Sequence, residues 1–348
     1  MKILRAPFWH LALLIGLLGS ILAACGSQGD SSQPTVRLGY FPNLTHAAAV
    51  VGVAQGLFTK ALGPNVKLQT TTFNAGPALI EALLARSLDI GYVGPNPAIN
   101  GYTQSKGAAL RIIAGASSGG ALFVVRPAAN IQSAKDLANK KLASPQLGGT
   151  QDVALRYYLQ QNGLKTADKG GNVQIVPTDN ANIVTLFKQG KIDGAWVPEP
   201  WATKLISEAG GKVFVDERSL WPNGKFTTTV IVVRKEFQDQ HPDLVKKFLQ
   251  GHVDSVQYIH DHQTEALNTV NSEIKRITGS STPQSELQQA AANVDITYDP
   301  VTSTLIQSAD RAYALGFLKS KPDLAGIYSL QALNDVLSSR GLAKVSGP

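Results

Sequence analysis

Two stretches of the sequence share one pattern, LDIGYVGPNPA from Leu88 to Ala98 and IDGAWVPEPWA from Ile192 to Ala202. Each carries an aspartate, a glycine, an aromatic residue, a valine and then a Pro-x-Pro sequence. The second copy begins roughly a hundred positions after the first, which is longer than any solenoid period. The repeat therefore indicates two similar lobes.

Strands and helices alternate before each copy. The first unit is predicted as strand, helix, strand, helix and strand over 35–41, 45–62, 66–73, 77–87 and 88–94. Thr45 is the predicted cap of its first helix. The second unit repeats this order over 140–200, with a glycine-rich loop after its first strand. Such alternation predicts an α/β fold with mainly parallel sheets flanked by helices.

The last third of the chain is mainly helical. After a strand at 227–237, apolar spacing of three and four predicts helices within 242–259, 283–294, 301–318 and 329–341. Helices of this kind need a sheet to pack on. We therefore expect the chain to cross back and complete the first lobe.

The N-terminus has the pattern of a secretion signal over 1–24, with Lys2 and Arg5 ahead of an apolar run. A short membrane anchor is the alternative for that run. LAAC, ending at Cys25, resembles the bacterial lipobox, so Cys25 is the predicted site of lipidation. Residues 25–34 are polar and predict a flexible tether. The signal and the lipobox together predict an extracytoplasmic protein that is anchored to the membrane by lipid. Because Cys25 is the only cysteine, we expect no internal disulfide.

The charge balance argues against a nucleic-acid partner. Once Lys2 and Arg5 leave with the signal, 30 of the 32 basic side chains remain against 25 acidic ones. These basic residues are scattered rather than gathered with aromatics in a stripe. The small positive excess is compatible with a small anionic ligand.

Six loops follow predicted strands or open predicted helices, and they read FPNLTHA, FNAGPA, VGPNPA, ASSGGA, QLGGTQ and VPEPWA. In an open α/β sheet, ligands bind at the carboxyl ends of the strands, where these loops meet. Helix N-termini there present free N–H groups and partial positive charge, which favour an anion. Each loop alone is also an ordinary turn composition. Together they predict a shared binding pocket.

Two short motifs resemble catalytic or phosphate-binding sequences, but each lacks a feature that the chemistry requires. GASSG at 115–119 matches a nucleophile elbow, but a strand follows it instead of a helix. QLGGTQD lacks the lysine of a phosphate-binding P-loop, and no dinucleotide fingerprint is present. We therefore expect no catalytic residue, no cofactor and no metal.

The histidines receive separate interpretations. His252, His260 and His262 resemble a metal cluster, but side chains two apart on a helix face different ways, so we interpret them as surface residues. His46 lies at a loop mouth, where it either donates to a ligand oxygen or sits on a helix surface.

Glu199 lies between two prolines in the second copy of the repeat. Its carboxylate either caps the helix that Trp201 begins or meets an amine or hydroxyl of a ligand. Of these two roles, we favour the helix cap for Glu199.

The segments RLGYFPNLTHAAAVVGVAQGLF, FNAGPALIEALLARSLDIGYVGPNPA, GGTQDVALRYYL and IDGAWVPEPWATKL resemble solute-binding proteins of ABC importers. The branch is the one that serves aliphatic sulfonates, taurine, nitrate and related anions. The resemblance covers essentially the whole mature chain. It implies a two-lobed periplasmic-binding-protein fold of type II, with lobe I at 35–123 plus 228–348 and lobe II at 124–227. It also implies two hinge crossings, near 123–126 and 227–230.

The resemblance implies that backbone amides and short polar side chains hold the anion. It assigns this role to Asn43, Thr45, His46, Asn74, Gly76, Gly94, Pro95, Asn96, Ser117, Ser118, Gly148, Gly149, Thr150, Glu199 and Trp201. No loop displays an arginine for bidentate recognition.

The function implied is a monomeric receptor that captures a small organic anion, with an aliphatic sulfonate preferred, and delivers it to an ABC permease. Alternatives are a nitrate, bicarbonate or taurine receptor, or a pyrimidine-precursor (thiamine-related) binding protein or enzyme on the same fold. The enzyme needs a reactive lysine or histidine pair in the cleft, and only His46 is suitably placed.

Overall fold

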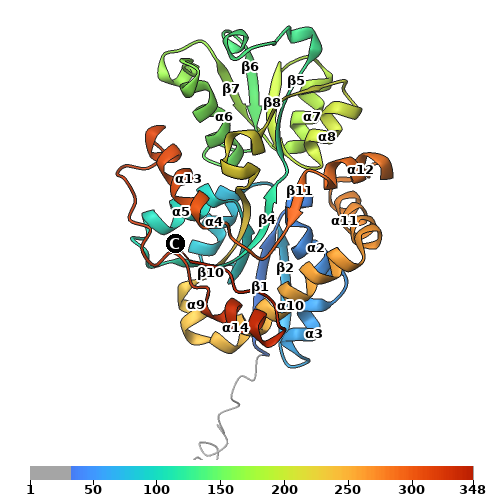
Figure 1. Ribbon diagram of the computed structural model, residues 1–348, viewed down its shortest axis with the longest axis vertical. Helices are drawn as coiled ribbons and strands as arrows, with labels where there is room; N and C mark the ends of the chain where they lie inside the picture. Colours follow the sequence, from blue (N-terminus) through green and yellow to red (C-terminus); the bar gives the residue numbers. More distant parts are fainter. Residues whose placement is uncertain (1–32, 348) are drawn as a thin grey trace, which may run out of the picture. The chain divides into compact units, whose positions relative to one another are not determined.

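The computed structural model describes residues 33–347. The predicted signal, Cys25 and most of the tether lie outside the described residues. From Thr35 onward the chain forms one compact unit that contains two sheets (Figure 1). Within 33–347, no helix is both long and apolar enough to cross a bilayer.

Sheet A, as far as the chain is described, has six strands in the order β11-β4-β10-β3-β1-β2. Their bounds are β1 Thr35–Tyr40, β2 Lys67–Thr72, β3 Ile90–Val93, β4 Leu110–Gly119, β10 Thr227–Arg234 and β11 Val294–Ile296. β1 pairs in parallel with β2 and β3, and β10 runs antiparallel between β3 and β4.

Sheet B has five strands in the described residues, in the order β7-β6-β8-β5-β9. Their bounds are β5 Ala121–Val125, β6 Lys141–Ser144, β7 Gln174–Pro177, β8 Gly194–Pro198 and β9 Lys212–Asp216. β6 pairs in parallel with β7 and β8, and β5 runs antiparallel between β8 and β9.

The two sheets share one topology, as the sequence repeat predicts. The order β4-β10-β3-β1-β2 in sheet A matches β9-β5-β8-β6-β7 in sheet B. In both, the antiparallel strand arrives from the other sheet. The chain changes sheets at Gly120, three residues before the predicted boundary, and again between Asp216 and Thr227. That these two places are hinges stays a prediction.

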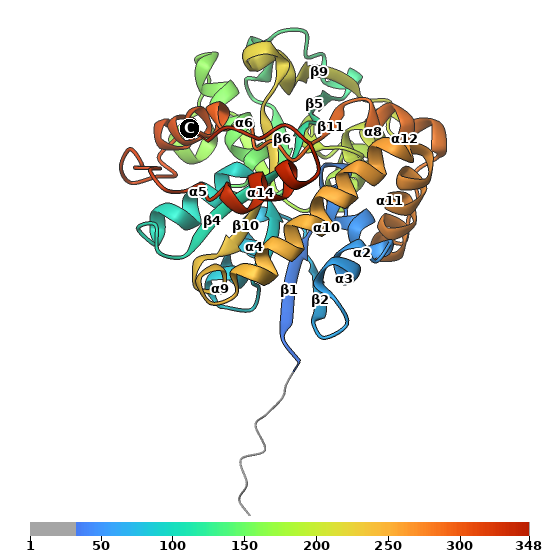
Figure 2. The ribbon, with the colours of Figure 1, turned by 60° about the horizontal axis from the view of Figure 1, so that its bottom comes forward.

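Helices flank both sheets. They are α2 Ala47–Ala54, α3 Leu57–Leu62, α4 Gly76–Leu84, α5 Pro95–Gln104, α6 Thr150–Gln161, α7 Asn180–Lys188, α8 Trp201–Ser207, α9 Lys235–Gln240, α10 Pro242–Asp261, α11 Gln263–Thr278, α12 Gln284–Ala291, α13 Ser303–Ala314 and α14 Gln331–Ser339. We call sheet A with α2–α5 and α9–α14 lobe I, and sheet B with α6–α8 lobe II. α10 contacts α2, α3 and α14 (Figure 2).

The central strands of each sheet are buried on both faces, whereas the edge strands β2, β7 and β9 are largely exposed. Along β10, Val230 and Val232 belong to one apolar cluster and Ile231 and Val233 to another, because side chains of a strand alternate between faces. β5 does the same in sheet B. Continuous apolar strands are therefore the expected pattern for this fold.

The first predicted helix is divided in the structure. A 3₁₀ turn, η2 Leu44–His46, precedes α2, and Gly56, with φ of 68°, separates α2 from α3. Glycine alone adopts this left-handed backbone without strain. The predicted cap role of Thr45 is wrong, because Thr45 lies inside the 3₁₀ turn and is buried.

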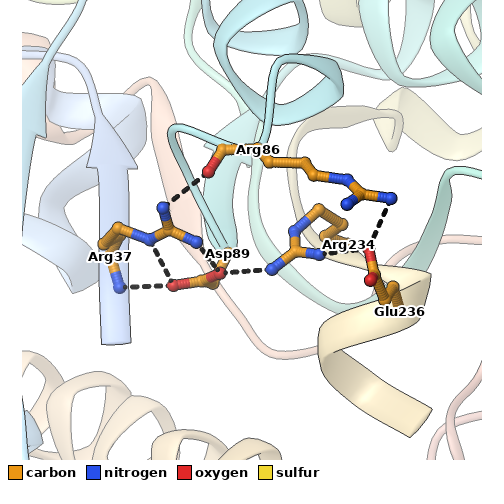
Figure 3. A network of polar contacts seen from close by, with 5 residues as sticks. All are labelled: Arg37, Arg86, Asp89, Arg234 and Glu236. Atoms are coloured by element: carbon orange, nitrogen blue, oxygen red, sulfur yellow. Dashed lines mark hydrogen bonds and ion pairs between the residues drawn. The ribbon is translucent and has the colours of Figure 1, made fainter. Parts of the chain in front are cut away.

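The aspartate of the first repeat comes directly before β3, at the opposite end of that strand from the Gly94 loop. Figure 3 shows its polar contacts. Asp89 is 1% exposed and accepts hydrogen bonds from Arg37 N at 3.0 Å, Arg37 Nη2 at 2.7 Å and Arg234 Nη2 at 2.8 Å. Burial opposes ionisation, but the hydrogen bonds from both arginines hold the pKa of Asp89 below its ordinary value. Asp89 thus joins β1 to β10.

The aspartate of the second repeat makes equivalent contacts. Asp193 accepts a hydrogen bond from Lys141 N, on β6, at 2.9 Å and from Arg126 Nη2, directly after β5, at 3.2 Å. In each lobe, one carboxylate therefore joins a parallel strand to the antiparallel strand from the other sheet. This shared role explains why both copies carry aspartate.

We expect Asp89→Asn to lower the free energy of unfolding by about 2 to 4 kcal/mol, because it leaves two arginines without their buried counter-charge. Asp193→Asn should cost less, since that carboxylate is 23% exposed. Urea unfolding followed by circular dichroism measures both. Asp239→Asn, in an exposed pair with Lys235, is the control and should change little. Equal losses in all three variants would contradict the assignment.

Candidate functional site

A small cavity lies between the ligand-side loops of the two lobes. Lobe I contributes Phe41, Asn43, Thr45, His46, Asn74, Ala75, Gly76, Gly94, Pro97, Thr228 and Thr229. Lobe II contributes Pro145, Gln146, Gly149, Thr150, Gln151, Asn180 and Pro198. The free volume is about 30 Å³, room for one or two water molecules or a small polar group. None of these lining residues is an aspartate, glutamate, lysine or arginine.

The sequence identified part of this lining. The predicted residues that line the cavity are Asn43, Thr45, His46, Asn74, Gly76, Gly94, Gly149 and Thr150. Those that lie outside the lining are Pro95, Asn96, Ser117, Ser118, Gly148, Glu199 and Trp201. Missed lining residues include Gln146, Asn180, Thr228 and Thr229. The three threonines that open β10 were a usable signal, because a polar start to an apolar strand marks the end that faces the cleft.

Four polar side-chain atoms in this lining have no hydrogen-bond partner. They are Gln146 Oε1, Thr150 Oγ1, Asn180 Oδ1 and Thr229 Oγ1, and all four are buried. A buried polar atom without a partner costs about 1 to 3 kcal/mol, so such atoms are rare unless they serve a purpose. Their convergence from both lobes on one cavity indicates a site for a polar ligand.

Helix starts add positive potential to the cavity. Gly76, Thr150 and Asn180 are the first residues of α4, α6 and α7. No side chain caps α4 or α6, so their first N–H groups stay free for other acceptors. Free N–H groups and the positive end of the helix dipole favour negative charge. The cavity is suited to an anion without any cationic side chain.

His46 is buried in the cavity wall. Its ring lies 4.2 Å from the ring of Phe41, and Nδ1 accepts a hydrogen bond from Phe41 N at 3.3 Å. Burial lowers the pKa of His46 to about 3, so the imidazole is neutral at physiological pH. A neutral ring whose Nδ1 accepts must carry its proton on Nε2. His46 therefore offers one donor and no charge, and its interpretation as a helix-surface residue is wrong.

Glu199 and Trp201 join the lobes. Trp201 Nε1 donates to Asn43 Oδ1 at 2.7 Å, and Leu44 N donates to the carbonyl of Glu199 at 3.0 Å. Glu199 Oε2 accepts from Thr203 N at 3.0 Å, which confirms its role as a cap of α8. Burial raises the pKa of Glu199. Loops from the two repeat units thus meet through hydrogen bonds beside the cavity.

Other predicted residues have partners within the fold. Asn96 Nδ2 donates to the carbonyl of Ser308 at 3.0 Å, Ser118 Oγ accepts from Phe226 N at 3.3 Å, and Gly148 N donates to Asp152 at 2.9 Å. Their predicted contact with a ligand stays a prediction.

The interpretation of His252 as a surface residue is wrong. It is fully buried, with Nδ1 2.8 Å from the hydroxyl of Tyr92 and Nε2 2.9 Å from the carbonyl of Gly115. Burial lowers its pKa to about 4. His260 and His262 are exposed, as expected. Over residues 33–347, no group of histidine, cysteine, aspartate and glutamate side chains is arranged to hold a metal ion.

Two sheets of equal strand order with a polar cavity between them define a two-lobed, solute-binding type of α/β fold. Residues 29–271 match the model of the NMT1-like family. The chain belongs to this family.

Named relatives come from the same branch that the sequence resembles. The chain is 30% identical to the taurine-binding periplasmic protein of Escherichia coli (strain K12) over 209 residues, 60% of this chain and 62% of that protein. It thus matches less than two thirds of that relative's length. It is 26% identical to a putative aliphatic sulfonates-binding protein of Bacillus subtilis (strain 168) over 315 residues, 88% of this chain and 90% of that protein.

Solved structures share the fold. The alkanesulfonate-binding protein SsuA of Xanthomonas axonopodis pv. citri, bound to MOPS, has a TM-score of 0.71 at 19% identity, covering 85% of this chain and 98% of that chain. The periplasmic nitrate-binding protein NrtA of Synechocystis PCC 6803 has a TM-score of 0.73 at 15% identity, covering 88% and 89%. These likenesses establish the two-lobed periplasmic-binding-protein fold of type II.

We expect Gly94→Ala to prevent the lobes from meeting. A Cβ there would lie 2.1 Å from Thr150 Oγ1 on the opposite lobe, far inside contact distance. Small-angle X-ray scattering should show a larger radius of gyration with an unchanged circular dichroism spectrum. Thr150→Gly in the same chain removes the obstructing atoms and should restore the native radius. A Gly94→Ala variant as compact as the native chain would contradict this account.

We expect His252 to contribute to acid sensitivity. Its pKa is lower in the folded chain than the ordinary 6.5, so the unfolded chain binds the proton more tightly. Stability is full above pH 6.5 and falls by about 1.4 kcal/mol per pH unit as pH drops toward 4. His252→Gln should flatten this slope in urea titrations between pH 7 and 4, and the exposed His262→Gln should leave it unchanged. Equal slopes in both variants would contradict the prediction.

Proposed function

We propose that this chain is the extracytoplasmic solute-binding receptor of an ABC importer, which captures a small organic anion between its lobes and delivers it to the permease. The observation that carries the proposal is the cavity, where unpartnered buried polar atoms and uncapped helix starts from both lobes converge. Relatives named for sulfonates and taurine support it.

We infer an aliphatic sulfonate as the ligand. A sulfonate carries one delocalised charge on three acceptor oxygens, which suits free helix N–H groups and Nε2–H of His46. The cavity as it stands has room for only a small polar group, about 30 Å³, so a short sulfonate would require the least separation of the lobes. Taurine is a second candidate that one observation favours. Gln146 Oε1 and Asn180 Oδ1 are acceptors without donors, and the ammonium group of taurine would supply donors to them.

Capture proceeds by closure of the lobes around the anion. We place the lobe boundaries at the two changes of sheet, Gly120 and the stretch between Asp216 and Thr227, close to the predicted boundaries at 123/124 and 227/228, and we take these crossings as hinges. The hydrogen bond between Trp201 and Asn43 forms only when the lobes meet, so it contributes to the closed state. An anion that bridges α4 of lobe I and α6 of lobe II stabilises the same state.

We further infer that the protein is not an enzyme and acts as a monomer tethered by lipid on Cys25. The cavity presents no pair of groups for acid–base or nucleophilic chemistry, because His46 is its one titratable lining residue and is held neutral. Turnover of a pyrimidine precursor by purified protein would overthrow this inference. Mass spectrometry of the N-terminal peptide from native membranes tests the lipid.

A thermal-shift panel tests the ligand. Methanesulfonate, taurine, nitrate, bicarbonate and a pyrimidine precursor are each titrated against the purified chain, because a ligand of the folded state raises the melting temperature by mass action. We expect the sulfonates to shift it most. A shift by nitrate alone would contradict the sulfonate assignment.

We expect Thr229→Val to have opposite effects on stability and binding. The variant keeps the shape of threonine and removes an unpartnered buried hydroxyl, so the ligand-free protein should gain up to about 1 kcal/mol of stability. Calorimetric titration with the best ligand of the panel should show roughly tenfold weaker binding, since a hydrogen bond to the anion is lost.

Thr282→Val is the matched control. Its hydroxyl is also buried without a partner, but it lies outside the cavity. It should stabilise the ligand-free protein and leave the affinity unchanged. Unaltered affinity in Thr229→Val would show that this hydroxyl does not contact the ligand.

A further inference from the structure

Away from the cavity, a half-buried arginine of lobe I contacts groups of lobe II. Arg311 is on α13, and its Cζ lies 3.6 Å from the ring centroid of Trp221 and 5.1 Å from that of Tyr157. Its Nη2 donates to the carbonyl of Leu220 at 3.2 Å. Tyr157 is on α6, and Leu220 ends the 3₁₀ helix η6 Glu217–Leu220. The guanidinium thus lies against two aromatic rings and a carbonyl of the opposite lobe.

The ring of Trp221 is itself fixed by a buried carboxylate. Glu217 accepts hydrogen bonds from Trp196 Nε1 at 2.7 Å and Trp221 Nε1 at 3.3 Å, and it is 1% exposed. Burial raises the pKa of Glu217 to about 7, and the charge of Arg311 opposes this rise. Trp196 and Trp221 both belong to the apolar core of lobe II. Arg311 therefore contacts a rigid part of that lobe.

The apolar face of α13 packs in the core of lobe I. Leu305, Ala309 and Ala312 pack in the same apolar cluster as Val230 and Val232 of β10. We therefore expect α13 to move with lobe I when the lobes separate. Opening of the lobes at this edge breaks every contact of Arg311 with lobe II at once.

A cation over an aromatic face is attracted by the ring, more strongly where water is excluded. Burial lowers the pKa of Arg311, so the guanidinium is partly desolvated. A contact that exists in only one of two conformations shifts the equilibrium by its own free energy. For the contacts of Arg311 we expect the ratio of closed to open forms to rise about tenfold.

We propose that Arg311 is a positioning residue for ligand capture, whose insertion between Trp221 and Tyr157 holds the lobes together and slows the departure of the bound anion. It acts on the ligand through the lobes, because Arg311, Trp221 and Tyr157 are all absent from the cavity lining. The effect on the lobes is independent of the ligand. The effect on the anion rests on the proposed function.

Small-angle X-ray scattering of the full chain without ligand tests the effect on the lobes. Fitted as a mixture of open and closed forms, Arg311→Gln should lower the closed-to-open ratio about tenfold, and Arg311→Lys, which keeps charge but not the planar stack, should lower it less. Arg276→Gln is the control, because Arg276 is exposed and pairs with Glu273 inside α11. An unchanged ratio in Arg311→Gln, or a native chain that is already fully open, would overturn the proposal.

Tyr157→Leu tests the same contact without changing Arg311. If Arg311→Gln does not fold, Tyr157→Leu and Arg311→Lys still remove parts of the contact, and both should open the lobes. In the double variant Arg311→Lys with Tyr157→Leu, the two effects should be less than additive, since they remove one shared contact. Full additivity would overturn the pairing.

Stopped-flow kinetics with taurine tests the effect on the anion. Arg311→Gln should raise the dissociation rate about tenfold with little change in the association rate. A loss confined to association would overturn the role of Arg311 in slowing the departure of the anion. Failure of the native chain to bind taurine would count against that ligand alone, and scattering would still decide the role of Arg311.

Discussion

The buried carboxylate of Glu199 fixes how the two lobes meet. Taking a charged group out of water is costly unless all of its hydrogen bonds are made. Burial raises the pKa of Glu199, and hydrogen bonds from Thr203 N at the start of α8 and from Asn293 Nδ2 just before β11 offset part of this cost. Its backbone bonds to Leu44 N and to the carbonyl of Gly120, where the chain changes sheets. One residue therefore ties together four segments that are distant in sequence.

The cavity follows from this arrangement. Helices α4 and α6 begin at the carboxyl ends of parallel strands in different lobes, and bringing the lobes together aims both starts at one small space. The two copies of the repeat then divide the work. The first supplies Gly94 and Pro97 to the cavity wall, while the second supplies Pro198 to the wall and Glu199 and Trp201 to the contact between lobes.

Local sequence signals predicted the framework well. Most apolar strands and amphipathic helices lie near their predicted bounds, because burial on both faces of a sheet leaves a direct pattern in the sequence. Helix α11 and the short strands β9 and β11 were not predicted, and α9 begins inside the strand predicted at 227–237. The break at Gly56 was missed, since a helical pattern continues across it and only the backbone angle reveals it. The burial of His46 and His252 was also missed. Both depend on what packs over them from remote segments.

The sequence by itself determined the succession of strands and helices along each unit, the duplication and the polar loops that end at the cleft, because periodicity and turn chemistry are local properties. Only the tertiary structure decided which of those loops reach the cavity and which join the lobes. It also brought Thr229 and Asn180 to the cavity wall and Arg311 to the ring of Trp221, and no local sequence pattern indicates these positions. The physical reason is that contact between lobes depends on distances between residues far apart in the chain, and local sequence carries no record of those distances.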